Sequence, residues 1–168
     1  MGLFDMFRSD RGEQMSAHLA FVTSLIYMMA ADGEMDHEEV GQLLAVLGGE
    51  KQQDGTIGVG AQNRDLLRKA QQIVRTTPLD TFLTQATPIL TDAQKMCVLT
   101  NLVDSSLSDG VAEPEEQVMF DKFMRAFGIA ESRFRPFFEV VSLKNDRTVF
   151  TNNLHPSNQP GFKVSLSV

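Results

Sequence analysis

The chain has no tryptophan, one tyrosine and one cysteine among its 168 residues. A single thiol cannot form an internal disulfide, and Cys97 lies in an apolar segment where we expect it to behave as a small hydrophobic residue. This cysteine usage is typical of a reduced, cytoplasmic compartment. Without tryptophan or a disulfide, we expect the core to be filled largely by the chain's 12 phenylalanines and 9 methionines.

Long apolar runs and dense basic runs are also missing. No stretch reaches the roughly 18 consecutive apolar residues of a membrane-spanning helix, and the first residues lack the pattern of a signal peptide. The net charge of −7 argues against a nucleic-acid partner, because a groove for phosphates needs a basic surface. The apolar start Met1–Phe7 is expected to dock either on a protein or on a membrane surface.

The negative charge is concentrated in two short segments, 31–39 and 108–116. Neither contains Lys or Arg, and removing their nine carboxylates from a net charge of −7 leaves +2 for the rest of the chain. Four positions match in type at a constant spacing of 77 residues, Asp32, Gly33, Glu38 and Glu39 corresponding to Asp109, Gly110, Glu115 and Glu116. The remaining carboxylates are those of Glu34, Asp36 and Glu113. Such a repeat suggests a site built twice.

The apolar residues outside these segments recur at three- and four-residue steps, which predicts helices. The helical segments are 16–30, 40–47, 63–76, 78–89, 92–107, 119–127 and 132–143. Pro88 is expected to close the fourth of these, Pro114 to take the first position of the helix that carries 119–127, and Gly128 to end that helix. The sequence therefore predicts an all-α bundle of about six to eight helices with two pseudo-symmetric helix–acidic turn–helix halves. We expect a short N-terminal segment (1–15), one helical domain (16–143) and an irregular C-terminal tail (144–168), with 50–60 as a polar, glycine-rich linker.

Helix capping explains most of the acidic residues without a ligand. Asp36 and Glu39 have the spacing of an N-cap and its capping-box glutamate, and carboxylates in a first helical turn favour the positive end of the helix dipole. The same reasoning covers Glu38, Glu115 and Glu116. It does not cover Asp32 and Asp109, which precede their helices and are each followed by a glycine.

Two interpretations of Asp32 and Asp109 remain open. Each aspartate can accept a hydrogen bond from its own backbone in an Asx turn. Alternatively, Asp32 with Glu39, and Asp109 with Glu116, bind a hard cation, calcium or magnesium, through oxygen ligands. The spacing is not that of an EF-hand, since His37 occupies the position where that loop requires glycine.

The pattern of a long apolar helix, the acidic turn 31–39 and a leucine-rich helix, repeated after a helical pair, resembles the TerB-like domain of tellurite-resistance proteins. The resemblance covers roughly 16–143. It implies an all-helical fold of two related halves, an acidic surface that binds metal, and a role in stress and tellurite-resistance systems that include a membrane partner. The matching positions are Asp32, Glu39, Asp109 and Glu116, with Glu34, Asp36, Glu38, Glu113 and Glu115 as neighbours.

The second turn departs from the first, because Val111 stands where the first has the acidic Glu34. Asp104, at the position equivalent to Tyr27, could compensate as a ligand or be an ordinary solvated helix residue.

These features favour a non-catalytic binding module that takes a divalent cation or a basic partner surface. One alternative is a metal-dependent hydrolase that uses the same carboxylates. Another is a scaffold whose acidic turns only cap helices while Phe134, Phe137 and Phe138 bind a partner. We expect those three rings to be buried. We also expect a cytoplasmic protein, with a peripheral place at the inner membrane surface as the alternative.

Overall fold

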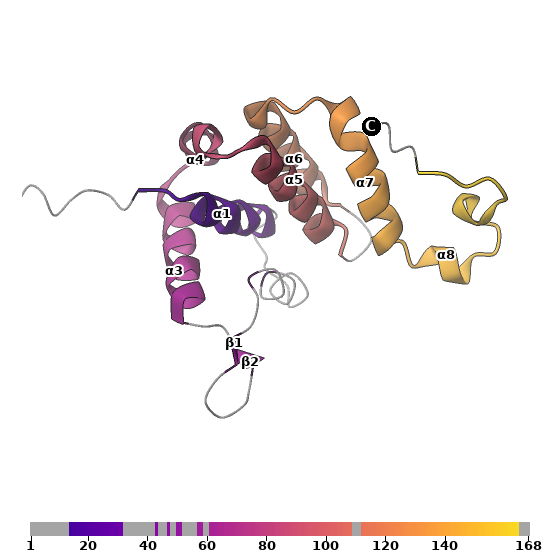
Figure 1. Ribbon diagram of the computed structural model, residues 1–168, viewed down its shortest axis with the longest axis horizontal. Coiled ribbons are helices and arrows are strands. Elements are labelled where there is room, and N and C mark those ends of the chain that lie inside the picture. Colours follow the sequence, from indigo (N-terminus) through magenta and orange to yellow (C-terminus); the bar gives the residue numbers. More distant parts are fainter. Residues whose placement is uncertain are drawn as a thin grey trace, which may run out of the picture.

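The helix α1 (Ala17–Met29) is the centre of the fold. A computed structural model describes residues 14–31, 43, 47, 50–51, 57–58, 61–108 and 112–164. Ser16 caps α1 by accepting the Leu19 N–H at 3.1 Å. From Val22 to Met29 every side chain is buried, because α1 packs against α3 (Ala61–Thr76) and α5 (Asp92–Ser106) and contacts α4 (Leu79–Ala86) and α6 (Pro114–Phe127) (Figure 1). A helix that is apolar all round requires such a central place.

Local sequence signals set the ends of the other helices. Thr91 and Gln94 form a capping box at the start of α5. The helix α6 begins with Pro114 and ends at Gly128, whose φ of 66° is the left-handed conformation that favours glycine. Both ends agree with the sequence prediction. The α4 helix gives way to the 3₁₀ turn η1 (Thr87–Ile89) at Pro88, as the sequence also predicted.

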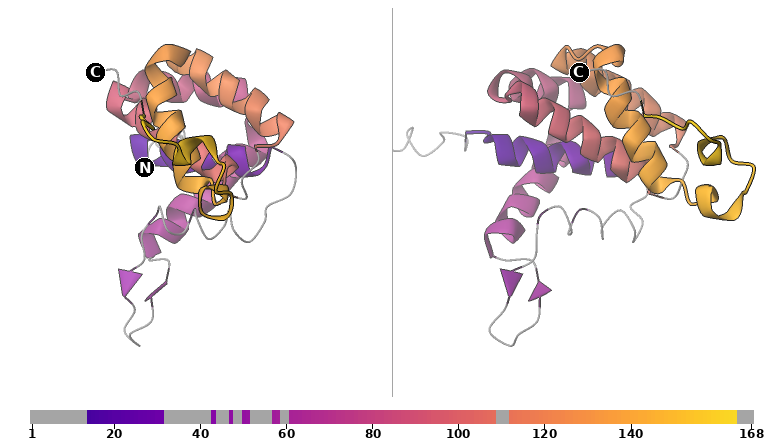
Figure 2. Two further views of the ribbon diagram at one scale, coloured as in Figure 1. Left: turned by 90° about the vertical axis from the view of Figure 1, so that its right-hand side faces the viewer. Right: turned by 45° about the vertical axis from the view of Figure 1, so that its right-hand side comes forward.

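The helices enclose one core, and the all-α class is confirmed. The α5 helix contacts both α6 and α7 (Glu131–Asn145), so it forms the second layer over α1 (Figure 2). The largest fully buried side chains of the core are Phe82, Phe123, Met28, Met29, Leu99 and Leu102. Among the described residues of the expected helix 40–47, Leu43 and Leu47 are helical and Leu43 is buried. The pseudo-symmetric relation of the two halves stays a prediction.

The structure corrects three local expectations. In the expected linker, β1 (Glu50–Lys51) pairs antiparallel with β2 (Ile57–Gly58), a contact too short to leave a period-two pattern. The helix α7 is longer than predicted and contains Pro136 beyond its first turn, which removes one backbone hydrogen bond. Cys97 is exposed rather than buried, because its neighbours Met96 and Val98 take the core-facing positions of α5.

The tail is also more ordered than expected. It contains α8 (Thr148–Thr151) and the 3₁₀ turn η2 (Pro156–Asn158). Asp146 accepts the Thr148 N–H at 2.9 Å and its other oxygen lies 2.8 Å from His155 Nε2, so one aspartate joins the two turns. Sequence reasoning missed these turns because the bond to His155 spans nine residues and follows no helical period. Residues 165–168 of the expected irregular tail lie outside the described ranges.

Candidate functional site

The two helices that precede the acidic turns end with the same backbone geometry. Ala30, the C-cap of α1, has φ −93° and ψ 5°, and Leu107, the C-cap of α5, has φ −100° and ψ 7°. The next residues, Ala31 and Ser108, each donate a hydrogen bond to the carbonyl three residues earlier, at 3.0 and 3.1 Å. The constant spacing of the acidic residues is thus matched in the backbone up to the point where each turn begins.

The two helix ends also face the same side of the molecule. The helices α1 and α5 pack against each other and run in the same general direction, so their C-terminal ends lie on one side in both Figure 1 and Figure 2. Asp32 and Asp109 follow these ends in the sequence. Both lie outside the described residues, as do Glu34, Asp36, Glu38 and Glu39. The described part of the site is therefore the two helix ends and the start of α6.

Glu116 closes the start of α6. It is only 7% exposed, and its carboxylate accepts the backbone N–H of Glu113 at 2.8 Å. This is the capping-box bond expected from the sequence. The side chains of Glu113 and Glu115 are exposed. Within the described ranges no three His, Cys, Asp or Glu side chains are grouped so that they could hold a metal ion.

Helix electrostatics divide the second turn into two parts. Glu113, Glu115 and Glu116 lie at the N-terminal end of α6, where the helix dipole favours negative charge. Asp109 follows the C-terminal end of α5, where the carbonyl groups carry partial negative charge. Capping and the dipole therefore account for the three glutamates of the second turn.

Asp104 is neither a solvated residue nor free to act as a ligand. Its side chain is 21% exposed, and both carboxylate oxygens lie 2.6 Å from Lys144 Nζ on α7. Asn145 Nδ2 donates to one of these oxygens at 2.8 Å. The expectation of a solvated side chain is wrong, because α7 brings a cation and an amide from 40 and 41 residues away.

A groove runs between α6 and α7 and reaches the second acidic turn. It consists of two neighbouring hollows, of 670 and 390 Å³, which share the lining residues Phe120, Asp121 and Phe138. Glu116 and Ala112 border the smaller hollow, beside the turn. Acidic lining residues outnumber basic ones four to two, the acids being Glu116, Asp121, Glu131 and Glu139 and the bases Arg125 and Arg135.

The phenylalanines of α7 differ in their exposure, and Phe137 lines neither hollow of the groove. Phe134 is 3% exposed and stacks on Phe137 with ring centroids 6.1 Å apart. Phe137 and Phe138 are 44% and 45% exposed. The prediction that all three rings are buried is correct only for Phe134, because α7 is an edge helix with no further helix packed on its outer face in the described structure. Sequence reasoning therefore missed the groove, whose walls come from two separate helices.

No helix in the described part of the chain has the length and apolarity needed to cross a membrane.

Comparison with protein families gives one finding that bears on identity. The family described as tellurite resistance protein TerB matches residues 18–137, which covers most of the chain and contains both acidic turns. Comparisons with curated proteins and with solved structures gave no match. The chain belongs to the TerB family of tellurite resistance proteins.

Proposed function

We propose that this chain is a non-catalytic acidic binding module of a tellurite-resistance or stress-response system, and that it takes a positively charged ligand between its two acidic turns. The observation that carries the proposal is the pair of helix ends. The C-caps Ala30 and Leu107 have matching geometry, and α1 and α5 end on the same side of the bundle. An Asp-Gly pair follows each of these ends in the sequence.

Electrostatics support a cationic ligand at this place. Two helix C-termini each contribute roughly half a negative charge, and the two turns add nine carboxylates without a Lys or Arg. Such a concentration of negative charge is self-repulsive unless a cation or a basic surface is bound nearby. Because the carboxylates of the two turns are oxygen ligands, calcium or magnesium is the first candidate.

The ligand set would be Asp32 with Glu39 and Asp109 with Glu116. Of these, Glu116 has a described side chain, and its carboxylate already accepts the Glu113 N–H. A carboxylate fixed by a backbone donor has a defined orientation toward a cation. Glu113 and Glu115, which are exposed at the same helix start, are the neighbouring acids.

Calorimetric titration with calcium, magnesium, manganese and zinc tests the cation. We expect binding by the wild type and its loss in Asp32→Asn/Asp109→Asn. The matched control is Asp65→Asn/Glu131→Gln, which removes the same charge from α3 and α7, away from the turns, and should bind like the wild type. Absence of heat up to millimolar metal, together with an unchanged melting temperature, would exclude the cation and leave a basic partner surface as the ligand.

A second candidate function, a protein-interaction scaffold, is favoured by the half-exposed Phe137 and Phe138 and by the groove beside Phe138. The acidic excess in the groove lining fits an amphipathic partner helix with basic residues beside its apolar face. Phe138→Ser should abolish binding of such a peptide, whereas Asp32→Asn/Asp109→Asn should leave it unchanged. Equal binding by Phe138→Ser would reject the groove as the binding surface.

The metal-dependent hydrolase remains the enzymatic alternative. Its supporting observation is the 390 Å³ hollow beside Glu116, lined mainly by apolar residues. Hydrolysis of ester or phosphoester substrates that depends on added metal and is lost in Asp109→Asn would favour it over the non-catalytic module.

We further propose that this protein is cytoplasmic and that it binds a membrane-associated protein partner at the inner membrane surface. The expected N-terminal docking segment, Met1–Phe7, lies outside the described residues. Fractionation with and without residues 1–7 tests this part, because a soluble distribution in both cases would reject the membrane location.

A further inference from the structure

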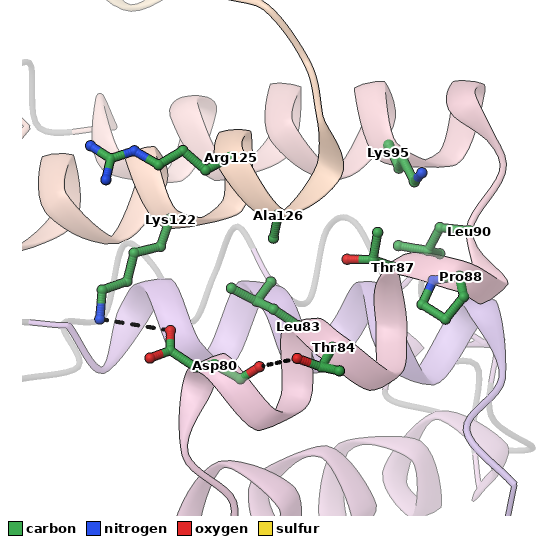
Figure 3. A pocket seen from close by; sticks show the side chains of 10 residues that line it. All are labelled: Asp80, Leu83, Thr84, Thr87, Pro88, Leu90, Lys95, Lys122, Arg125 and Ala126. Carbon is green, nitrogen blue, oxygen red and sulfur yellow. Dashed lines mark hydrogen bonds and ion pairs between the residues drawn. The ribbon is translucent and has the colours of Figure 1, made fainter.

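A hollow of 690 Å³ lies between α4 with η1 on one side and α5 with α6 on the other (Figure 3). Its charge is opposite to that of the chain. Its lining contains three basic residues, Lys95, Lys122 and Arg125, and one acidic residue among those described, Asp80. The net charge of the lining is therefore +2, in a chain of net charge −7. A local excess of this kind raises the concentration of anions at the hollow.

The three cations come from two helices, α5 and α6, and are only weakly neutralised. Lys122 and Arg125 are three residues apart on α6, so they project from one face of that helix. Lys122 Nζ lies 3.9 Å from Asp80, and the two side chains are 48% and 81% exposed. An exposed pair at this distance contributes little stability, so an anionic ligand can compete with Asp80 for the ammonium group. Lys95 comes from the first turns of α5, near the positive end of its dipole.

The middle of the hollow is apolar. Figure 3 shows Leu83 and Ala126 between the end that carries Lys122 and Arg125 and the end near Lys95. Leu83 is 4% exposed and Leu90, also in the lining, 6%. Such an apolar surface suits the hydrocarbon part of an organic ligand better than a free inorganic ion.

Thr87 adds a polar group to the wall. Its hydroxyl oxygen is buried and has no hydrogen-bond partner within the described structure. A buried hydroxyl without a partner is unfavourable, and rotation of the Thr87 side chain toward the hollow would let a ligand oxygen supply the missing bond.

We propose that this hollow binds an organic phosphate. The phosphate group lies between Lys122 and the planar guanidinium of Arg125, which suits phosphate oxygens. The carbon body of the ligand covers Leu83 and Ala126, and Lys95 supplies further positive charge at the far end. A volume of 690 Å³ is within the range of small-molecule sites.

Titration of the full chain with inorganic phosphate, phenyl phosphate and vesicles containing phosphatidic acid tests this site and separates a soluble from a lipid source. We expect phenyl phosphate to bind about tenfold more tightly than inorganic phosphate, because its ring buries apolar surface. Lys95→Gln/Lys122→Gln should weaken binding by at least about tenfold. Arg125 is left unchanged because it also lines the α6–α7 groove.

Two further variants make the outcome decisive. Arg68→Gln/Lys69→Gln removes the same charge from α3, outside the lining of the hollow, and should bind like the wild type. Asp80→Asn should strengthen binding, because it removes the anion that competes for Lys122. Binding of the vesicles alone, weakened by Lys95→Gln/Lys122→Gln but not by the control, supports the site and assigns it to a lipid headgroup. Absence of binding by all three probes at millimolar concentration, or equal weakening by the two double variants, overturns it.

Discussion

Lys144 on α7 holds both carboxylate oxygens of Asp104 on α5 at 2.6 Å. With Asn145, this contact joins the edge helix to the central layer. Asp104 is 21% exposed and Lys144 61%, so the pair is partly shielded from solvent.

We predict that Asp104→Ala lowers the free energy of unfolding by about 1–2 kcal/mol, since an ion pair and a hydrogen bond are lost together. Lys144→Met should cost less, about 0.5 kcal/mol, because Asn145 still donates to Asp104. Urea unfolding of both single variants and the double variant measures the coupling, which should fall as salt is added. Strict additivity at low salt would show that the contact contributes no stability.

Glu116 offers a test that separates a capping role from a ligand role. Glu116→Ala should destabilise the protein by at least about 1 kcal/mol, because the Glu113 N–H at the helix start loses its acceptor. Glu116→Gln keeps an acceptor oxygen and should retain most of that stability. Thermal unfolding without metal gives both values, with Glu115→Ala on the exposed side of the same turn as the control. A cation that stabilises the wild type but not the stable Glu116→Gln variant would add the ligand role.

The tail should loosen in acid because of Asp146. The Thr148 hydroxyl, the Thr148 N–H and His155 hold the pKa of Asp146 below its usual 3.8, although burial acts in the opposite direction. Since the folded pKa is depressed, the stabilisation is present above the unfolded pKa and is lost as the pH falls below 3.8 through the folded value.

We therefore expect amide protection at Thr148 to disappear at the same pH at which the Asp146 carboxyl carbon titrates by NMR. Glu139→Gln, which leaves these contacts in place, should not change that pH. An Asp146 titration at or above 3.8 would contradict the structure.

The phenylalanines of α7 should differ in their energetic roles. Phe134→Ala should cost about 3 kcal/mol or more, because the ring is buried against Phe120 and Phe137. Phe138→Ala should cost about 1 kcal/mol, since nearly half of its side chain is already exposed. Denaturant unfolding with Phe150→Ala as an 89% exposed reference tests the order. Equal losses at Phe134 and Phe138 would mean that the groove side of α7 is covered in solution.

Local signals predicted the helix ends well. Pro114 and Gly128 act within a few residues of themselves, so the sequence predicted both ends of α6. The capping box of Thr91 and Gln94 at the start of α5 is equally local, but the structure revealed it. The all-α class follows from the same local periodicity. The repeated Asp-Gly segments carried the resemblance to the TerB family, and the family match over residues 18–137 confirms it.

The places where prediction was wrong are set by partners far away in the sequence. Cys97 lies in an apolar segment but on the exposed side of α5, and Phe137 and Phe138 belong to an apolar pattern on a helix that is not covered. Asp104 has a sequence environment typical of a solvated residue until α7 places Lys144 beside it. No local pattern indicates which face of an edge helix is covered.

The acidic site shows the same division. The amino-acid sequence by itself determined the helices, their caps and the two acidic segments, because each depends on contacts between neighbours along the chain. Only the tertiary structure decided that α1 and α5 end on one side of the molecule. It also decided that the buried Glu116 lines the α6–α7 groove and that one hollow is lined by Lys95, Lys122 and Arg125. These relations depend on how helices pack across the core, which the chemistry of one segment does not specify.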